Sequence, residues 1–209
     1  MPRAASSAIG IDWTLAVDHL AKADPKLRPL IDRHGHPTIR PTRNAVQSLA
    51  RAIVGQQLSP RAAQTIWERV LAIYDGTFPR PDTILATPDA TLRAAGLSGA
   101  KTAALKDLAR HVVEKRLVPR KLPRATDAEV AAMLLPVRGI GPWSVDMFLM
   151  FALARPDVLP TGDLGVRKGM QLHFRLRKLP EPDRMTALAA PWRPFRSIGS
   201  WYMWRLLES

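Results

Sequence analysis

Two glycines at alternate positions, Gly139 and Gly141, stand in a short turn between two predicted helices, the second of which Pro142 can begin. Glycines at this spacing allow a tight turn whose backbone N–H groups approach a ligand closely, and the N-terminus of the following helix adds a positive dipole end. Such a turn can hold one phosphate of a nucleic-acid backbone without reading its sequence. A Gly-x-Gly turn alone is weak support, because it also serves as a plain helix–helix connection.

Two aspartates downstream of this turn could supply a carboxylate to a reaction. Asp163 follows Pro160-Thr161-Gly162 and directly precedes a predicted helix, whose N-terminus it can cap. Capping alone would explain an aspartate at that position. Asp146 is the rival, but it lies three residues after Trp143 and is better explained as a residue on the face of the helix.

Positive charge points to an acidic partner. The 209 residues include 31 Lys+Arg and 18 Asp+Glu, which gives a formal net charge of +13. Eight of the basic residues fall within 101–125 and five within 161–180, so the excess is clustered. Solvated helix faces would explain either cluster alone. Together they favour a polyanion, with nucleic acid the first candidate and an anionic membrane surface the second.

Several classes of protein are excluded by composition. The chain has no cysteine, which excludes disulfides, thiol catalysis, Cys-ligated zinc and Cys-ligated iron–sulfur clusters. No histidine has partners at ligand spacing, so no metal site built from side chains is expected. No apolar run approaches 18 residues and no signal peptide is evident, so we expect a cytoplasmic protein that does not span a membrane.

The elements that must position these residues are helices. Apolar residues recur at helical spacing from Trp13 onward, and no strand alternation is convincing. Nineteen prolines punctuate about ten short helices. Helix starts are predicted at Thr42, at Ser59-Pro60, at Thr87-Pro88, at Thr126 with Glu129 as a capping box, and at Pro142. Further helices fit Gly99 to Lys115, Leu164 to Phe174 and Phe195 to Leu207.

Four segments in order carry a family resemblance. They are AIVGQQLSP (52–60), GIGPWS (139–144), LPTGDLGVRKG (159–169) and WRPFRSIGSWYMW (192–204). Together they are similar to the helix-hairpin-helix DNA glycosylases, and within them to the AlkA-type 3-methyladenine DNA glycosylases. The resemblance covers roughly residues 11 to 207. It implies an all-α, two-lobed fold, with double-stranded DNA bound across the cleft between the lobes.

The resemblance implies that Asp163 is the catalytic carboxylate as well as a cap. Cleavage of a glycosidic bond passes through an oxocarbenium-like transition state, which a nearby negative charge stabilises. The carboxylate could also orient or deprotonate the attacking water. Trp143 stands where bifunctional relatives carry a lysine nucleophile, so release of the base without strand cutting is expected.

The substrate pocket is implied to include Trp143 and Trp204, whose electron-rich rings suit a positively charged alkylated base. From the residues alone, Trp143 could equally be a buried hinge and Trp204 a core residue. The family commonly presents tyrosines near the positions of Met147 and Leu164. This departure puts the shape and selectivity of the pocket in doubt.

A flipped base leaves a gap in the stack, which a side chain of the penetrating loop must fill. The aligned position is Gln57, with Leu58 as the adjacent candidate; a polar helix end with no such role is the alternative.

The turn that contains Gly139 and Gly141 corresponds to the hairpin of the family, and its backbone N–H groups are implied to hold a phosphate. The residues concerned are Gly139, Ile140, Gly141 and Ser144. In the family, carbonyls of this turn can also hold a monovalent cation.

The expected organisation is a flexible tail over residues 1–10 and a glycosylase core over 11–209. One lobe is expected from about 42–155, and the other from about 11–41 with 156–209. No N-terminal domain of the kind that larger AlkA proteins carry is expected. The predicted activity is monofunctional hydrolysis of alkylated purines, 3-methyladenine first and 7-methylguanine second, by a monomer in base excision repair. The alternatives are a non-catalytic DNA-binding module and a glycosylase for deaminated or oxidised bases.

Overall fold

The computed structural model describes residues 12–208 and divides the chain into two compact units. One unit joins the chain up to Pro41 with residues 149–209, and the other runs from Thr42 to Phe148. The chain therefore leaves the first unit after its N-terminal helices and returns to it for its C-terminal helices. The expected tail over residues 1–10 lies outside the described residues. The second boundary falls after Phe148, earlier than the expected position near 155.

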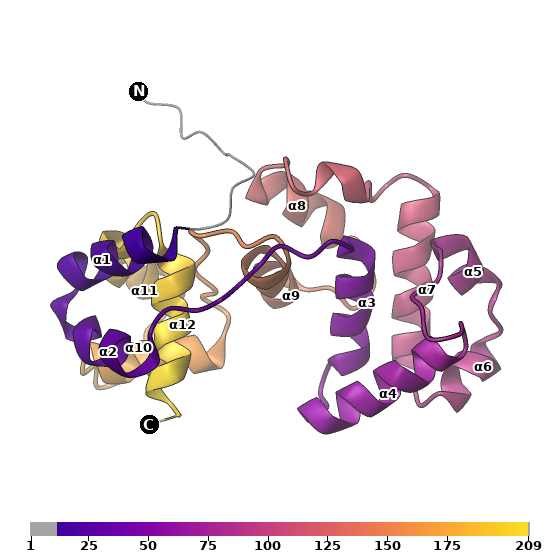
Figure 1. The fold of residues 1–209 in the computed structure, drawn as a ribbon, viewed down its shortest axis with the longest axis horizontal. Helices are drawn as coiled ribbons and strands as arrows, with labels where there is room; N and C mark the ends of the chain where they lie inside the picture. Colours follow the sequence, from indigo (N-terminus) through magenta and orange to yellow (C-terminus); the bar gives the residue numbers. More distant parts are fainter. Residues whose placement is uncertain (1–11, 209) are drawn as a thin grey trace. The chain divides into compact units, whose positions relative to one another are not determined.

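Twelve α-helices and no strand occur within residues 12–208, so the all-α prediction is confirmed and the expected count of about ten was low (Figure 1). Three short 3₁₀ segments and one π-helix, Phe148–Ala152, connect them. The α-helices are α1 (Trp13–Ala23), α2 (Arg28–His34), α3 (Ala45–Gly55), α4 (Pro60–Ala72), α5 (Pro81–Ala86), α6 (Asp89–Ala94), α7 (Gly99–Val113), α8 (Asp127–Leu134), α9 (Pro142–Met147), α10 (Leu164–His173), α11 (Pro182–Leu188) and α12 (Arg196–Leu206).

The first unit consists of α1, α2 and α10 to α12. Its core is a single cluster of buried apolar residues in which α10 and α12 pack closely against each other. The cluster consists of Ala16, Leu20, Leu27, Leu30, Val166, Met170, Met185, Ala189, Trp192, Ile198, Tyr202 and Met203. Burial of this many large side chains supplies most of the stability of such short helices, which are marginal alone.

The second unit consists of α3 to α9. Helix α7 packs against both α3 and α5, and α3 also packs along α4. The buried residues include Leu49, Ile53, Ile84, Leu105 and Leu108, each at most 2% exposed. This packing brings the C-terminal end of α3 next to the first half of α7.

The N-cap residues observed at the helix starts confirm some of the capping predictions and contradict others. The capping box is confirmed, because Thr126 Oγ1 accepts from the backbone N–H of Glu129 and the Glu129 carboxylate accepts from that of Thr126. Ser59 caps α4 as predicted. The prediction for Thr42 was wrong: Asn44 caps α3 instead, with Gln47 N–H donating to its side chain at 3.0 Å. Thr87 caps no helix, because its hydroxyl bonds to Tyr74 and to the carbonyl of Thr83.

Candidate functional site

A cavity of about 570 Å³ opens in the second unit between the end of α3 and the start of α9. It gathers residues predicted separately for three roles. Two of the lining residues are Gln57 and Leu58, from the loop expected to fill the gap left by a flipped base, which we call the wedge loop. The others are Ile140 and Ser144 of the hairpin, and Trp143 and Met147 of the expected pocket. The rest of the lining comes mainly from α3 and includes Leu49, Ala52 and Ile53. The structure therefore places all six at one surface.

The wedge loop is a single tight turn. The N–H of Leu58 donates to the carbonyl of Gly55 at 3.2 Å, while Gln56 has φ −52° and ψ 134° and Gln57 has φ +56°. These angles are those of a type II turn, in which glycine is favoured at the position that Gln57 occupies. Gln57 is exposed and Leu58 is half-buried. The backbone thus accepts an unfavourable conformation that presents the side chain of Gln57 to solvent.

The backbone of the hairpin is held by two side chains for which the sequence predicted no such role. Asp107 of α7 accepts the backbone N–H of Arg138 at 2.9 Å. The side-chain amide of Gln56 donates to the carbonyl of Gly139 at 2.7 Å. Gln56 thereby joins the wedge turn to the hairpin. No local pattern links these residues, because 83 positions separate Gln56 from Gly139.

Only one hairpin glycine is required by conformation. Gly139 has φ +79°, and a Cβ there would lie 3.2 Å from that of Ala104. Gly141 has φ −106°, and a Cβ there would meet nothing within 4 Å. Gly139 therefore allows the turn to lie flat against α7, whereas Gly141 leaves open space before the N-terminus of α9.

Trp143 and Ser144 lie in the first turn of α9, whose N-cap Gly141 has an extended backbone. First-turn N–H groups point out of the N-terminal end of a helix, which is the geometry that binds phosphate. The indole of Trp143 is 48% exposed at the cavity, so its interpretation as a buried hinge was wrong.

In the first unit, Asp163 is the N-cap of α10, as predicted. Its Oδ1 accepts from the backbone N–H of Val166 at 2.8 Å and from the indole Nε1–H of Trp204, also at 2.8 Å. Two donors to one oxygen fix the orientation of the carboxylate. Leu164, the next residue, is 53% exposed. Trp204 is half-buried between this carboxylate and the ring of Phe151, 5.8 Å away between centroids.

The contact between Trp204 and Asp163 depends on two glycines of α10. A Cβ at Gly165 would lie 2.8 Å from Cδ1 of Trp204 and 3.0 Å from Oδ1 of Asp163. A Cβ at Gly169, one turn later, would lie 2.3 Å from the backbone oxygen of Met203. The distances of 2.8 and 2.3 Å are shorter than real Cβ atoms tolerate, so α10 and α12 approach this closely only with glycine at these positions.

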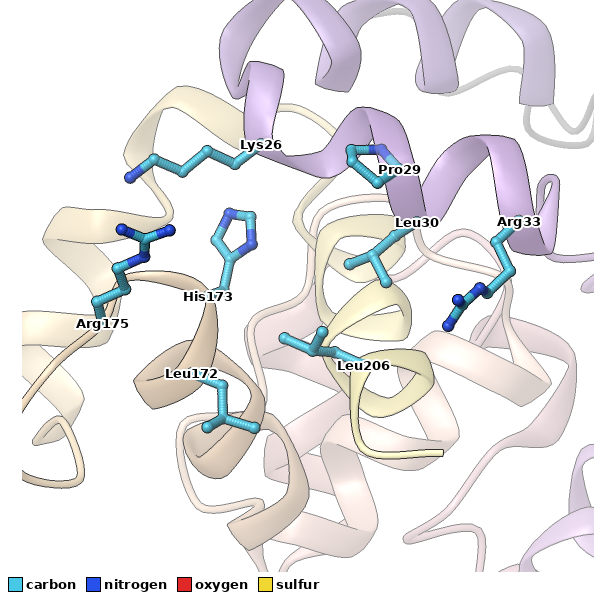
Figure 2. Close-up of a pocket in the computed structure, with 8 residues that line it drawn as sticks. All are labelled: Lys26, Pro29, Leu30, Arg33, Leu172, His173, Arg175 and Leu206. Carbon is cyan, nitrogen blue, oxygen red and sulfur yellow. The ribbon is translucent and has the colours of Figure 1, made fainter. Parts of the chain in front are cut away.

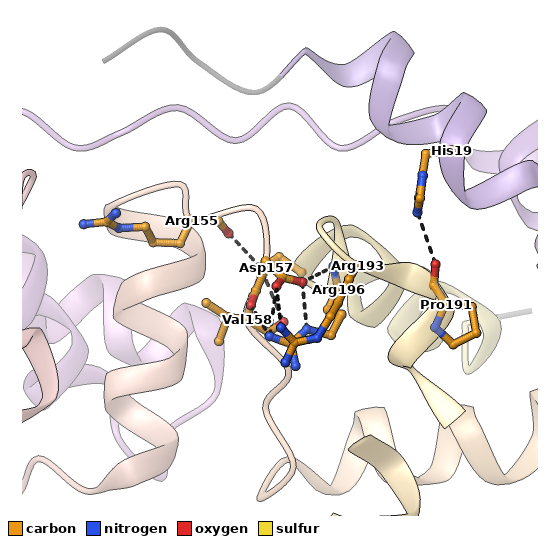
Figure 3. Close-up of polar contacts among 8 residues, drawn as sticks. His19, Arg155, Asp157, Val158, Pro191, Arg193 and Arg196 are labelled. Atoms are coloured by element: carbon orange, nitrogen blue, oxygen red, sulfur yellow. Dashed lines mark hydrogen bonds and ion pairs between the residues drawn. The ribbon is translucent and has the colours of Figure 1, made fainter. Parts of the chain in front are cut away.

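The segment that leads to Asp163 is clamped to the start of α12 (Figure 3). Arg196 makes a two-pronged contact with Asp157, at 2.7 Å from Nε and 3.0 Å from Nη2. The Ser197 hydroxyl donates to the Arg155 carbonyl at 2.7 Å and accepts the N–H of Val158 at 2.9 Å. Paired charged hydrogen bonds of this kind are strong and directional. These contacts hold the segment before Asp163 against the start of α12, the helix that contains Trp204.

The rival carboxylate, Asp146, lies on α9 in the second unit and is half-buried. Burial, with a smaller contribution from the charge of Asp127, raises its pKa to about 6.

Within residues 12–208 there is no group of three His, Cys, Asp or Glu side chains that could hold a metal ion. Over the same span, no helix is long and apolar enough to cross a membrane.

Part of the 101–125 basic cluster is engaged within the protein. Lys101 donates to the carbonyl of Val54 at 2.8 Å, and burial lowers its pKa. Lys106 pairs with Asp89, Arg110 with Asp107 and Arg116 with Glu114. These four basic side chains therefore contact groups of the protein itself, which the clustering of charge alone did not predict.

Comparisons with known proteins identify relatives of this chain. The chain is 34% identical to DNA-3-methyladenine glycosylase 1 of Schizosaccharomyces pombe, over 92% of this chain and 86% of the relative. It is 31% identical to the putative DNA-3-methyladenine glycosylase YfjP of Bacillus subtilis, over 92% and 68%.

Solved structures agree. The 3-methyladenine DNA glycosylase of S. pombe, in complex with abasic DNA, matches with a TM-score of 0.78 and 32% identity, covering 91% of this chain and 95% of that one. A DNA-3-methyladenine glycosidase from Bacillus halodurans matches with a TM-score of 0.80 and 30% identity, covering 91% and 88%. The model of the HhH-GPD superfamily matches residues 50–194. With the hairpin, the capped aspartate and the helical fold described above, these matches establish that the chain belongs to the HhH-GPD superfamily of base excision DNA repair proteins.

Proposed function

We propose that this protein is a monofunctional DNA glycosylase that removes alkylated purines, 3-methyladenine first and 7-methylguanine second, from double-stranded DNA. The names of its relatives support the activity and the substrate class. The observation that carries the proposal is the doubly held carboxylate of Asp163, at the position that the family motif assigns to catalysis.

Asp163 acts on the sugar. As the N-glycosidic bond breaks, positive charge develops on the sugar ring, and a fixed carboxylate stabilises it without having to reorganise. The same group can accept a proton from the water that attacks the ring. Because Trp143 replaces the lysine that would attack the sugar, the product is a free base and an intact strand with an abasic site.

The second unit grips and opens the duplex. The hairpin binds one phosphate through the backbone N–H groups of Gly139, Gly141 and Ser144. Ile140 was wrongly included among these donors, because its N–H donates to the carbonyl of Val137 at 3.0 Å. A monovalent cation held by carbonyls of the same turn would add positive charge there. Gln57, exposed at the tip of its turn, fills the gap left by the flipped base, with Leu58 beside it. The exposed indole of Trp143 offers its face to a cationic base, and Trp204 is proposed as a second wall.

Met147 lines the cavity beside Trp143, whereas Leu164 follows Asp163 on α10. Neither supplies the aromatic face that the family commonly has there. We infer a more pliable pocket with a narrower or shifted range of bases. Action as a monomer, a cytoplasmic location and the absence of an iron–sulfur cluster stay predictions.

The test is base release from duplex DNA treated with a methylating agent, with the wild type beside Asp163→Asn. Asparagine still caps α10, so the variant should fold and bind DNA with unchanged salt dependence, while base release falls by about 10³-fold or more. The wild type should free 3-methyladenine and leave no strand breaks.

Two outcomes would replace this proposal. If neither protein frees a base yet both bind DNA equally, Asp163 is only a cap and the protein is a DNA-binding module. If the wild type acts on duplexes with deaminated or oxidised bases and not on methylated DNA, the substrate class is wrong.

A further inference from the structure

A second cavity, of about 440 Å³, lies in the first unit where α2 faces the ends of α10 and α12 (Figure 2). Its lining consists of Lys26, Pro29, Leu30, Arg33, Leu172, His173, Arg175 and Leu206. Asp163 caps the opposite end of α10, and a ten-residue helix is about 15 Å long. The cavity is therefore separate from the carboxylate proposed to catalyse base release.

Three exposed cations surround the cavity. Lys26 and Arg175 lie on the same side of His173, whereas Arg33 lies beyond Leu30 (Figure 2). Among the described residues, none of the three makes an ion pair with a carboxylate. Arg167, from the same basic cluster as Arg175, is instead tied to Glu181 at 3.3 Å. The positive charge at this cavity is therefore available to a ligand.

The floor of the cavity is fixed. The His173 side chain is 4% exposed, and its Nε2 lies 2.6 Å from Oδ2 of Asp24, which also accepts the indole N–H of Trp192 at 3.1 Å. Burial opposes ionisation of Asp24, but the contacts with His173 and Trp192 outweigh it, so the pKa of Asp24 lies below its usual value. A rigid floor lowers the entropic cost of binding.

The remaining wall is apolar. Pro29, Leu206 and Leu172 line it, and Leu172 is 57% exposed, while Leu30 at the same wall is buried in the core. Exposed apolar side chains ringed by charge are typical of protein-binding sites. A DNA backbone needs the cations but gains little from the leucines, because its contacts are with phosphate and sugar. The combination fits a carboxylate-bearing chain with a large apolar side chain to bury.

We propose that this cavity binds a short acidic segment of a partner protein, in which a large apolar side chain enters between Leu30 and Leu172 while flanking carboxylates pair with Lys26, Arg33 and Arg175. Recognition of acidic motifs by clustered cations is an established mode of peptide binding. The site adds a docking function to the proposed repair activity and does not depend on it.

The probe is a fluorescein-labelled peptide, Glu-Asp-Leu-Glu-Phe-Asp-Glu, whose binding is followed by fluorescence anisotropy at about 0.15 M salt. The double variant Lys26→Glu/Arg175→Glu should weaken binding at least tenfold, and Leu172→Ser about threefold. A matched control, Lys22→Glu/Arg184→Glu, makes the same change of charge at exposed positions of the same unit outside the cavity. It should weaken binding less than twofold. A peptide with serine in place of Leu and Phe should bind the wild-type protein about as weakly as the original peptide binds the double variant.

Equal losses for the cavity variant and the control would overturn the proposal, because the peptide would then be sensing net charge alone. Competition by undamaged duplex DNA, together with loss of DNA affinity in Lys26→Glu/Arg175→Glu but not in the control, would assign the cavity to DNA instead. Base release by the cavity variant should stay within twofold of the wild type. Since all substituted residues are exposed, unchanged thermal unfolding will establish that each variant is folded.

Discussion

In the pair α10 and α12 the atoms proposed to act on the substrate belong to side chains, whereas in the hairpin before α9 the atoms proposed to bind phosphate belong to the backbone. The Asp163 carboxylate is oriented by one indole donor and one cap bond, and two glycines admit the neighbouring helix. The backbone of the hairpin is instead held by the side chains of Asp107 and Gln56. The first arrangement has no room for a Cβ at Gly165 or Gly169, whereas the hairpin has open space at Gly141.

The most damaging change should be Gly169→Ala in α10. Its Cβ would lie 2.3 Å from a backbone oxygen of α12, which cannot move aside as a side chain could. We expect a loss of about 3 kcal/mol in the free energy of unfolding, or roughly 6–12 °C in Tm. Gly141→Ala is the matched hairpin control, with open space around its Cβ, and should lose less than about 0.5 kcal/mol. Equal losses in the two variants, by thermal denaturation, would remove the contrast between the regions.

Trp204→Phe tests orientation of the carboxylate directly. Phenylalanine retains an aromatic face but lacks the Nε1–H that Asp163 accepts. A hydrogen bond to a charged group contributes about 1.5–3 kcal/mol, so single-turnover base release should slow roughly 10- to 100-fold with unchanged affinity for DNA. Trp201→Phe, on the same helix, is the control and should stay within twofold. A loss of affinity with no change in rate would make Trp204 a binding residue only.

Asp146→Asn separates the rival carboxylate from catalysis through pH. The folded protein holds this proton up to about pH 6, whereas an unfolded aspartate releases it near 3.8. Stability therefore falls as the pH rises from about 4 to 6 and stays lower above it. The variant should gain about 1–2 kcal/mol at pH 7.5 and nothing near pH 4, measured by urea unfolding. Base release should be retained; its loss would make Asp146 the catalyst.

The smallest expected effect concerns the support of the hairpin. Gln56→Met keeps the length of the side chain but cannot donate to the carbonyl of Gly139. A loss of about 1 kcal/mol corresponds to a roughly fivefold weaker affinity for undamaged duplex DNA, measured by anisotropy. Gln64→Met, an exposed position of α4 in the same unit, should leave affinity unchanged. If both variants bind like the wild type, the hairpin is rigid without Gln56.

The helix caps and most of the helices could be predicted from the local sequence. The cap at Asp163, the box at Thr126 and the amphipathic helices follow from rules that act within four residues. The helices α2, α5 and α11 were not predicted, because each spans at most seven residues and depends on tertiary packing of one or two side chains such as Leu30 and Ile84.

The side-chain contacts that hold the site in place could not be predicted from the local sequence. Asp107 reaches Arg138 across 31 positions and Trp204 reaches Asp163 across 41, and neither spacing has a local signature. Family resemblance could name Trp204 as a pocket residue, but only the geometry reveals it as a donor to the carboxylate. The same holds for Gly165 and Gly169, whose requirement becomes visible once α12 is in place.

The exposure of Trp143 has an optical consequence. Of the six tryptophans, Trp67 and Trp192 are buried and Trp13, Trp201 and Trp204 are half-buried, so iodide in solution should quench the emission of Trp143 most strongly. A purine stacked on this ring would both quench its red-shifted fluorescence and shield it from iodide. The protein therefore contains an unlabelled spectroscopic reporter, with which the capture of a base could be timed separately from its release.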